Sequence, residues 1–233
     1  MGIREFWTVF LQSSLLIQTV FGVLGVMSFL SWSVIFFKWR QIAVRHRQVL
    51  SHISILGAAR NWREALQGII LTPDSPSYRV AKEGAAERGR IARMGLPKAD
   101  EARVALESMR HAMASETQAQ VDELGTGIPL LATCSTAGPL LGLFGTVTGI
   151  MDSFHGFSEV RTMSLSAVGP GLAEALATTI VGLIVAIPAT LAHNYLLSRL
   201  GRLESDLRRF SESFLNAMKK DFTAAAKQAP RTP

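Results

Sequence analysis

Residues 127–151 read GIPLLATCSTAGPLLGLFGTVTGIM, and residues 169–197 read GPGLAEALATTIVGLIVAIPATLAHNYLL. Each segment is apolar over at least the ~20 residues that a helix needs to cross a bilayer. Both contain glycine, proline and threonine, and the second contains Glu174, where a simple anchor would have leucine and isoleucine. The two segments therefore predict membrane-spanning helices with a task beyond anchoring.

Residues 11–37 form a further apolar segment, in a chain that is 48% hydrophobic. Basic residues follow this segment, beginning with Lys38 and Arg40, and only Arg4 precedes it. A cleaved signal peptide has its positive charge before the apolar region. We therefore expect a retained first span whose C-terminal end is cytoplasmic.

The basic residues are distributed unevenly between the segments outside the spans. One lies before the first span, 14 lie in residues 38–127, one lies in 152–170 and eight lie in 198–233. The positive-inside rule places the two basic-rich segments in the cytoplasm. The net charge of +6 thus flanks the spans, which favours a membrane protein and argues against a nucleic-acid partner.

The predicted fold is an all-α integral membrane protein, with its N-terminus outside and its C-terminus in the cytoplasm. Between the spans, the mixed charges of the large loop predict a helical domain with a break at residues 72–77 and another at Pro97. The predicted parts are an outside segment 1–10, transmembrane helix 11–37, cytoplasmic helical domain 38–127, transmembrane helix 128–151, outside loop 152–170, transmembrane helix 171–197, and cytoplasmic amphipathic helix and tail 198–233.

The tail carries apolar residues at steps of three and four, which is the pattern of one apolar face of a helix. We expect this helix to continue the third span into the cytoplasm. The residues of the face are Leu203, Leu207, Phe210, Phe214, Met218 and Phe222.

Four glycines in the second span fall within ~60° of one another on a helix surface. Such a stripe lets helix backbones approach closely in lipid, either within one chain or between subunits. Thr146 lies beside the stripe and can bond back to its own helix. The residues predicted for helix packing or kinking are Gly138, Pro139, Gly142, Gly145 and Gly149, with Gly182 and Pro188 in the third span.

The third span has one small and polar side, from Glu174 through Thr178 and Thr179 to Thr190, and one bulky apolar side. The polar side is expected to face protein or a water-filled space. Glu174 has two interpretations. It is either an interfacial carboxylate near a helix N-terminus, where the dipole favours negative charge, or an acid facing a pore or partner.

The sequence contains no motif of a soluble enzyme and no metal-spaced cluster, so we expect neither catalysis nor a cofactor. Cys134, the single cysteine, excludes a disulfide within the chain. One copy of three spans encloses no pore, so a ring of copies with inward polar faces is the economical assembly.

The chain resembles the TolQ/ExbB family, relatives of the flagellar stator protein MotA. Residues 142–147 (GLFGTV), 149–151 (GIM), 170–176 (PGLAEAL) and 187–189 (IPA) carry the resemblance. The chain has Thr148 where many relatives have tryptophan. It also has Thr178 where familiar members have alanine before the channel threonine, which therefore maps to Thr179.

The resemblance implies a proton path lined by Thr146, Glu174 and Thr179, with Thr178 beside it. It implies a homopentamer around a single-span TolR-like or ExbD-like partner, whose Asp carries the proton, and an energy transducer like TolA or TonB. Proton flow would drive work on the outer membrane, for envelope constriction at division or for nutrient uptake. The resemblance also implies the bacterial inner membrane, so the two outside segments, 1–10 and 152–170, would be periplasmic. The short segment before the first span favours the TolQ type of the Tol-Pal system.

Two other functions remain open from the residues alone. A structural membrane scaffold would use the glycine and threonine faces only to pack a partner helix. A secondary transporter subunit is disfavoured, because three spans contain no inverted repeat.

Overall fold

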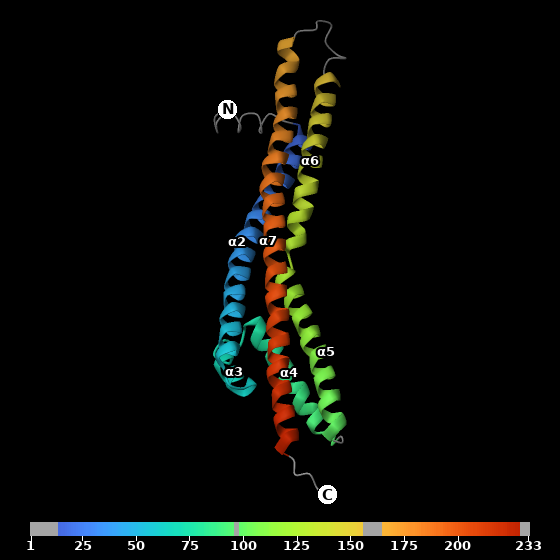
Figure 1. Ribbon diagram of the computed structural model, residues 1–233. Helices are drawn as coiled ribbons and strands as arrows, with labels where there is room; N and C mark the ends of the chain where they lie inside the picture. Colours follow the sequence, from blue (N-terminus) through green and yellow to red (C-terminus); the bar gives the residue numbers. More distant parts are fainter. Residues whose placement is uncertain (1–13, 96–97, 156–164, 229–233) are drawn as a thin grey trace. The chain divides into compact units, whose positions relative to one another are not determined.

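The computed structural model describes residues 14–95, 98–155 and 165–228, and every regular element in them is an α-helix (Figure 1). The predicted all-α class is therefore confirmed. The helices are α2 (Leu15–Ala58), α3 (Trp62–Ile69), α4 (Pro76–Ala92), α5 (Lys98–Gly125), α6 (Ile128–His155) and α7 (Leu165–Gln228).

Three of the described helices are long and apolar enough to cross a membrane, as the sequence predicts. They are α2, α6 and the part of α7 that begins at Gly169. The chain divides into two compact units. Unit 1 comprises Met1–Lys38 and Gly127–Leu196, and unit 2 comprises Trp39–Thr126 and Leu197–Pro233.

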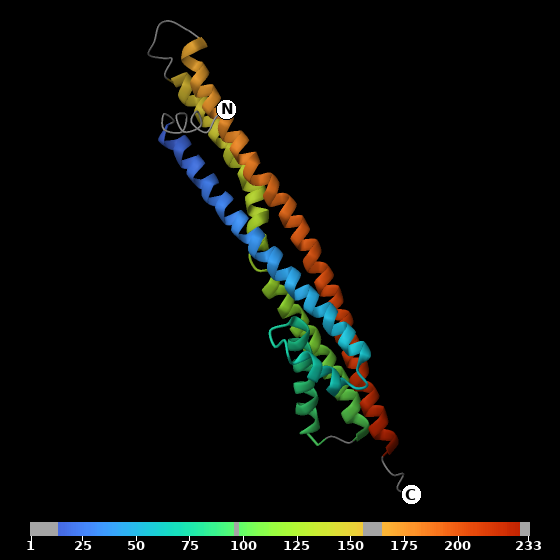
Figure 2. The same cartoon turned by 90° about the vertical axis from the view of Figure 1, so that its left-hand side faces the viewer.

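Unit 1 contains the membrane spans. Helix α6 lies beside the first part of α7 in both views (Figures 1 and 2). The first part of α2 packs on α7 through two small apolar clusters. In these clusters Ile17 and Phe21 contact Ala177, while Val20 and Leu24 contact Val185.

Unit 2 is built around the last part of α7, which continues the third span as one helix of 64 residues. The predicted apolar face of this part is buried from Leu203 to Met218, with Phe210 and Phe214 among the largest fully buried side chains. Helices α3, α4, α5 and the end of α2 complete the core. The predicted amphipathic tail helix is confirmed over these residues, and the side chain of Phe222 lies outside those described.

Two helix starts in unit 2 follow from local capping. Asn61 and Ser75 accept hydrogen bonds from the third residue after each of them, Glu64 and Tyr78. Pro76 occupies the first position of α4, where its missing N–H costs no helical hydrogen bond. A break between α3 and α4 is thus confirmed, although α4 already begins at Pro76, inside the predicted break of residues 72–77. Pro97 lies outside the described residues.

The segment between the second and third spans is shorter than the predicted loop of residues 152–170. Helix α6 runs to His155, and α7 already begins at Leu165. Pro170, the last residue of the predicted loop, lies inside α7. Membrane helices tolerate proline, because neighbouring helices and side chains can satisfy the freed backbone groups.

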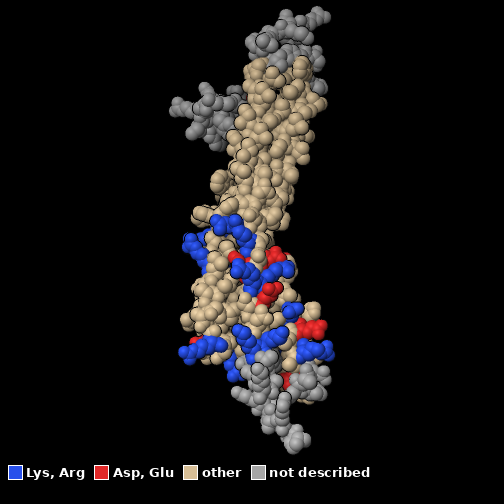
Figure 3. All heavy atoms as spheres, viewed as in Figure 1, with Lys and Arg blue, Asp and Glu red and all other residues tan. Residues whose placement is uncertain are grey.

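Charged side chains gather on unit 2, whereas the membrane spans are nearly free of them on the face drawn in Figure 3. Exposed large apolar side chains cover the spans instead, among them Phe29, Phe144 and Ile184. A soluble protein rarely exposes so continuous an apolar surface, whereas a bilayer requires one.

Candidate functional site

The candidate site lies inside unit 1, where α6 and α7 approach closely along the predicted glycine stripe. A methyl group placed on Gly142 would lie 3.0 Å from the Thr178 carbonyl oxygen and 3.4 Å from the Gly182 Cα. A methyl on Gly138 would lie 3.0 Å from the Gly182 carbonyl oxygen. The obstacles are backbone atoms, so only glycine permits this separation of the helices.

The stripe continues toward the C-terminal end of α6 and the N-terminal end of α7. A methyl on Gly149 would lie 2.9 Å from the Ala175 Cβ, and a methyl on Gly145 would lie 2.7 Å from the Thr178 hydroxyl. A methyl on Gly171 of α7 would likewise lie too close to the Ser153 hydroxyl oxygen of α6. All four glycines of the stripe are therefore used in packing within one chain.

Three threonine hydroxyls meet at this close approach. Thr146 of α6 donates to the Gly142 carbonyl at 2.9 Å, and Thr179 of α7 reaches the same oxygen at 3.1 Å. The hydroxyls of Thr146 and Thr179 also contact each other directly. Thr178 lies 2.7 Å from the Ala175 carbonyl oxygen and 3.0 Å from that of Gly142.

The three threonines differ in exposure. Thr178 is fully buried, whereas Thr146 and Thr179 are half-buried. The exposed side chains of Leu143 and Leu183 flank the latter two along the seam between the helices. Thr146 and Thr179 thus present hydroxyl groups to whatever lies beside the seam, and Thr178 does not.

Glu174 does not belong to the hydroxyl cluster. It is half-buried and forms no hydrogen bond or ion pair with any residue that the structure describes. At ~100° per residue it lies about 140° around α7 from Thr179. The structure therefore brings together Thr146, Thr178 and Thr179 and leaves Glu174 apart.

The two prolines predicted to shape the spans lie inside continuous helices. Pro139 is in α6 and Pro188 is in α7. Each proline lacks the N–H that would bond to the carbonyl four residues earlier. Near the other end of the pair, His193 Nδ1 lies 3.4 Å from the Ile128 carbonyl oxygen.

Sequence analysis predicted that Thr146 can bond back to its own helix, as it does to Gly142, but did not identify the two backbone carbonyls that organise the cluster. The oxygens of Gly142 and Ala175 accept bonds from side chains of both helices. One signal was available, because Thr146 follows Gly142 by four residues and a threonine can bond to the carbonyl one turn earlier. The partner across the helix pair required the structure.

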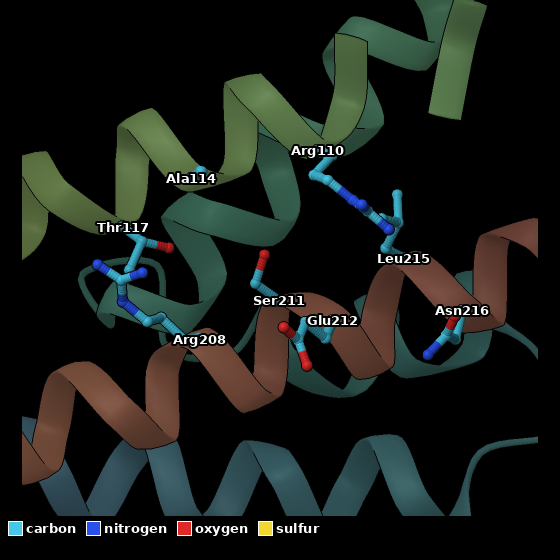
Figure 4. A pocket seen from close by; sticks show the side chains of 8 residues that line it. All are labelled: Arg110, Ala114, Thr117, Arg208, Ser211, Glu212, Leu215 and Asn216. Atoms are coloured by element: carbon cyan, nitrogen blue, oxygen red, sulfur yellow. The ribbon is translucent and has the colours of Figure 1, made fainter. Parts of the chain in front are cut away.

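Unit 2 offers a second candidate, a groove of about 370 Å³ between α5 and α7. Arg110 extends from α5 toward Leu215, and Arg208 extends from α7 toward Thr117, so the arginines lie at opposite ends (Figure 4). Glu212 lies between them, and Arg208 is already paired with Glu204 at 2.7 Å. The groove therefore lacks the convergent charges of a small-ligand site.

Among the described residues, no group of three or more His, Cys, Asp or Glu side chains could hold a metal ion. The hydroxyl cluster between α6 and α7 is the strongest concentration of hydrogen-bonding groups within the spans. A run of buried polar groups at this depth is costly in lipid and is usually functional.

Comparison with known proteins bears directly on this helix pair. Residues 74–209, which include all of the cluster, match the model of the MotA/TolQ/ExbB proton channel family. The chain belongs to the MotA/TolQ/ExbB proton channel family. The resemblance stated from the sequence is thereby confirmed.

The similarity to individual members extends along most of the chain. The Tol-Pal system protein TolQ of Haemophilus influenzae is 30% identical over 90% of this chain and 92% of its own length. TolQ of Pseudomonas aeruginosa is 31% identical over 89% and 90%. The biopolymer transport protein ExbB of Pseudomonas putida is 27% identical over 92% of this chain and 64% of its own length.

Within the proton channel family, the more complete matches to TolQ support the TolQ-like assignment. The three apolar helices and these relatives make the chain a multi-pass inner-membrane protein. Family membership further makes it a subunit of an energy-transducing membrane complex.

Proposed function

We propose that the chain is the proton-channel, or stator, subunit of a complex of the TolQ–TolR–TolA or ExbB–ExbD–TonB type. In this function it couples the proton motive force to work on the outer membrane. Copies of the chain form a pentameric ring, and the α6–α7 seam of each copy turns toward the lumen. Thr146 and Thr179 line the proton path, and Glu174 lies at another position of the lumen wall.

The hydroxyl pair of Thr146 and Thr179 is the observation that carries this proposal. Hydroxyl groups both donate and accept hydrogen bonds, so they can hold water or a protonated acid without being charged themselves. A charged group at the same depth would have a far higher insertion cost. The described part of the spans contains no cluster of titratable groups at the seam, so a partner must supply the proton carrier.

The proposed partner is a single-span TolR-like or ExbD-like protein with an Asp in its helix. A carboxylate that binds and releases a proton complements a wall of hydroxyl groups. The complex passes its work to a TolA-like or TonB-like transducer.

We place residues 1–10 and 152–170 in the periplasm, and residues 38–127 and 198–233 in the cytoplasm. The 14 basic residues of the large loop support this orientation. In a Cys134→Ala background, an impermeant maleimide added to intact cells with a permeabilised outer membrane should label Ser158→Cys but not Gln67→Cys. Labelling of Gln67→Cys in cells whose inner membrane is intact would show that the topology is the reverse of the proposed one.

A cell assay tests the proposed function. Thr179→Ala and Thr146→Ala should each abolish partner-dependent resistance to detergent in a strain that depends on this subunit, while the complex still assembles. Thr148→Ala is the matched control, because within the described part of the chain Thr148 bonds only to the carbonyls of Phe144 and Gly145 in its own helix. This control should retain full resistance.

A scaffold is the competing function, favoured by the fact that each of the three threonine hydroxyls has an acceptor inside the helix pair. In that case the threonines would only hold α6 and α7 together. Loss of the complex in Thr179→Ala and Thr146→Ala would support the scaffold. Retained resistance in both variants would exclude the two threonines from the path.

A further inference from the structure

The Thr178 side chain packs directly against Gly145 of the facing helix α6. A methyl placed on Gly145 would lie 2.7 Å from the Thr178 hydroxyl oxygen and 3.0 Å from its methyl carbon. The Thr178 side chain has no exposed surface. This residue therefore touches neither lipid nor lumen, and any role that it has must act through its neighbours.

The carbonyl lone pairs around Thr178 are fewer than the hydroxyl groups that can donate to them. The Gly142 and Ala175 carbonyl oxygens each have two lone pairs. The helical N–H groups of Thr146 and Thr179, four residues further on, each take one of them. Two carbonyl lone pairs therefore remain for the hydroxyl protons of Thr146, Thr178 and Thr179.

The distances indicate how this shortage is resolved. The shortest of the threonine-to-carbonyl bonds runs from Thr178 to the Ala175 oxygen, at 2.7 Å. When Thr178 takes that lone pair, only the Gly142 oxygen is left for Thr146 and Thr179, and one of these two hydroxyls must donate to the other. The direct contact between the Thr146 and Thr179 hydroxyls is the geometry that this arrangement requires.

We propose that Thr178 is a positioning residue that links the hydroxyls of Thr146 and Thr179 by occupying the Ala175 carbonyl. This inference rests on the proposed function and concerns the same helix pair. In the linked pair, one hydroxyl bonds to Gly142 and the other donates to the first. The oxygen of the donating hydroxyl then keeps its lone pairs for a protonated group at the seam.

Removal of the Thr178 hydroxyl frees the Ala175 oxygen. Thr146 already lies 3.2 Å from that oxygen and would turn toward it, while Thr179 would keep the Gly142 oxygen at 3.1 Å. Each of the two seam threonines would then be bonded to a carbonyl, and the link between them would be lost.

Two substitutions separate this role from packing. Thr178→Val keeps the volume of the side chain and removes the hydroxyl, whereas Thr178→Ser keeps the hydroxyl and removes a methyl group. Positioning predicts that the valine variant, reconstituted with its partner in vesicles, loses about tenfold in proton flux, the effect of one ordinary hydrogen bond. The proton flux of the serine variant should stay within about twofold of the wild type, because serine keeps the hydrogen bond to the Ala175 carbonyl.

A second readout follows the link itself and needs no activity. In threonine-labelled protein, the ¹³Cβ resonance of Thr179 should shift in Thr178→Val and in Thr178→Ala but stay in place in Thr178→Ser. The opposite pattern, with serine defective in flux and valine normal in both measurements, would show that Thr178 only fills space and would overturn the inference.

Thr179→Val separates the inference from the proposed function. If Thr179→Val loses flux while Thr178→Val keeps both flux and resonance, the positioning role alone fails. If Thr179→Val keeps its flux, the proton path fails, and the Thr179 resonance in Thr178→Val still decides whether Thr178 positions its neighbour.

Discussion

Thr146 and Thr179 meet because α6 has glycine at the positions where a larger side chain would keep α6 and α7 apart. Their hydroxyls share the Gly142 carbonyl oxygen, which lies on that stripe. The same residue therefore provides the close approach with its missing side chain and the acceptor with its backbone. Gly142 therefore determines both the helix packing and the hydrogen bonding of the two threonines.

In unit 2, the buried His52 gives a prediction for how stability depends on pH. Its ring is buried among hydroxyls, with Ser77 at 2.6 Å from Nδ1 and Thr72 at 2.8 Å from Nε2. Burial lowers the pKa of His52 below its ordinary value of 6.5, because the charged imidazolium is poorly solvated there. No acidic side chain lies within ion-pair distance of this ring among the described residues.

The lowered pKa of His52 gives the pH dependence a definite sign. The unfolded chain binds a proton near pH 6.5, before the folded chain does, so the free energy of unfolding is largest above this pH and falls as the pH drops below it. Denaturant unfolding between pH 8 and pH 5 should show a shallower acid-side fall in His52→Gln than in the wild type. The exposed His111→Gln variant is the control and should follow the wild type. Identical slopes for wild type and His52→Gln would contradict this prediction.

At the scale of elements, α6 and α7 form a pair fixed by backbone contact. Gly142→Ala places a methyl 3.0 Å from the Thr179 Cα, and no side chain can move aside to relieve this contact. The helices must separate, so we expect a loss of about 1–3 kcal/mol in the free energy of unfolding. Unfolding of the purified protein in mild detergent measures this loss.

Gly22→Ala is the matched control for this change. Gly22 lies in the α2 span, and a methyl there meets no atom within 4 Å. This variant should show no loss and a gain of up to about 1 kcal/mol, because alanine favours a helix over glycine. Equal effects of the two variants would show that close backbone approach does not hold the pair together.

At the scale of the whole molecule, the fold was largely predictable because hydropathy and charge report membrane spans strongly. Three spans and the continuation of the third into the tail follow from the pattern. The start of α7 did not, since a membrane helix accepts a proline such as Pro170, which the predicted loop of residues 152–170 included. Helix α4 was not identified, although Ser75 and Pro76 were the signal for its start.

The candidate site was predictable as a set of residues but not as an arrangement. Helical angles gave the small face of α7 that contains Thr178 and Thr179, and the glycine stripe predicted close packing. They could not show that α6 lies against this face, so the burial of Thr178 and the separate position of Glu174 emerged only from the structure. Interhelical register depends on contacts between residues far apart in the sequence, which periodicity does not contain.

Proton flux into vesicles that contain the purified complex of this chain and its single-span partner tests the central claim most directly. Under an imposed pH gradient, a pH-sensitive dye should report flux for the wild type and for Thr148→Val, and flux at the level of empty vesicles for Thr179→Val in an equally assembled complex. Equal flux in the Thr179→Val complex and the wild type would contradict the account of the α6–α7 seam as the proton path.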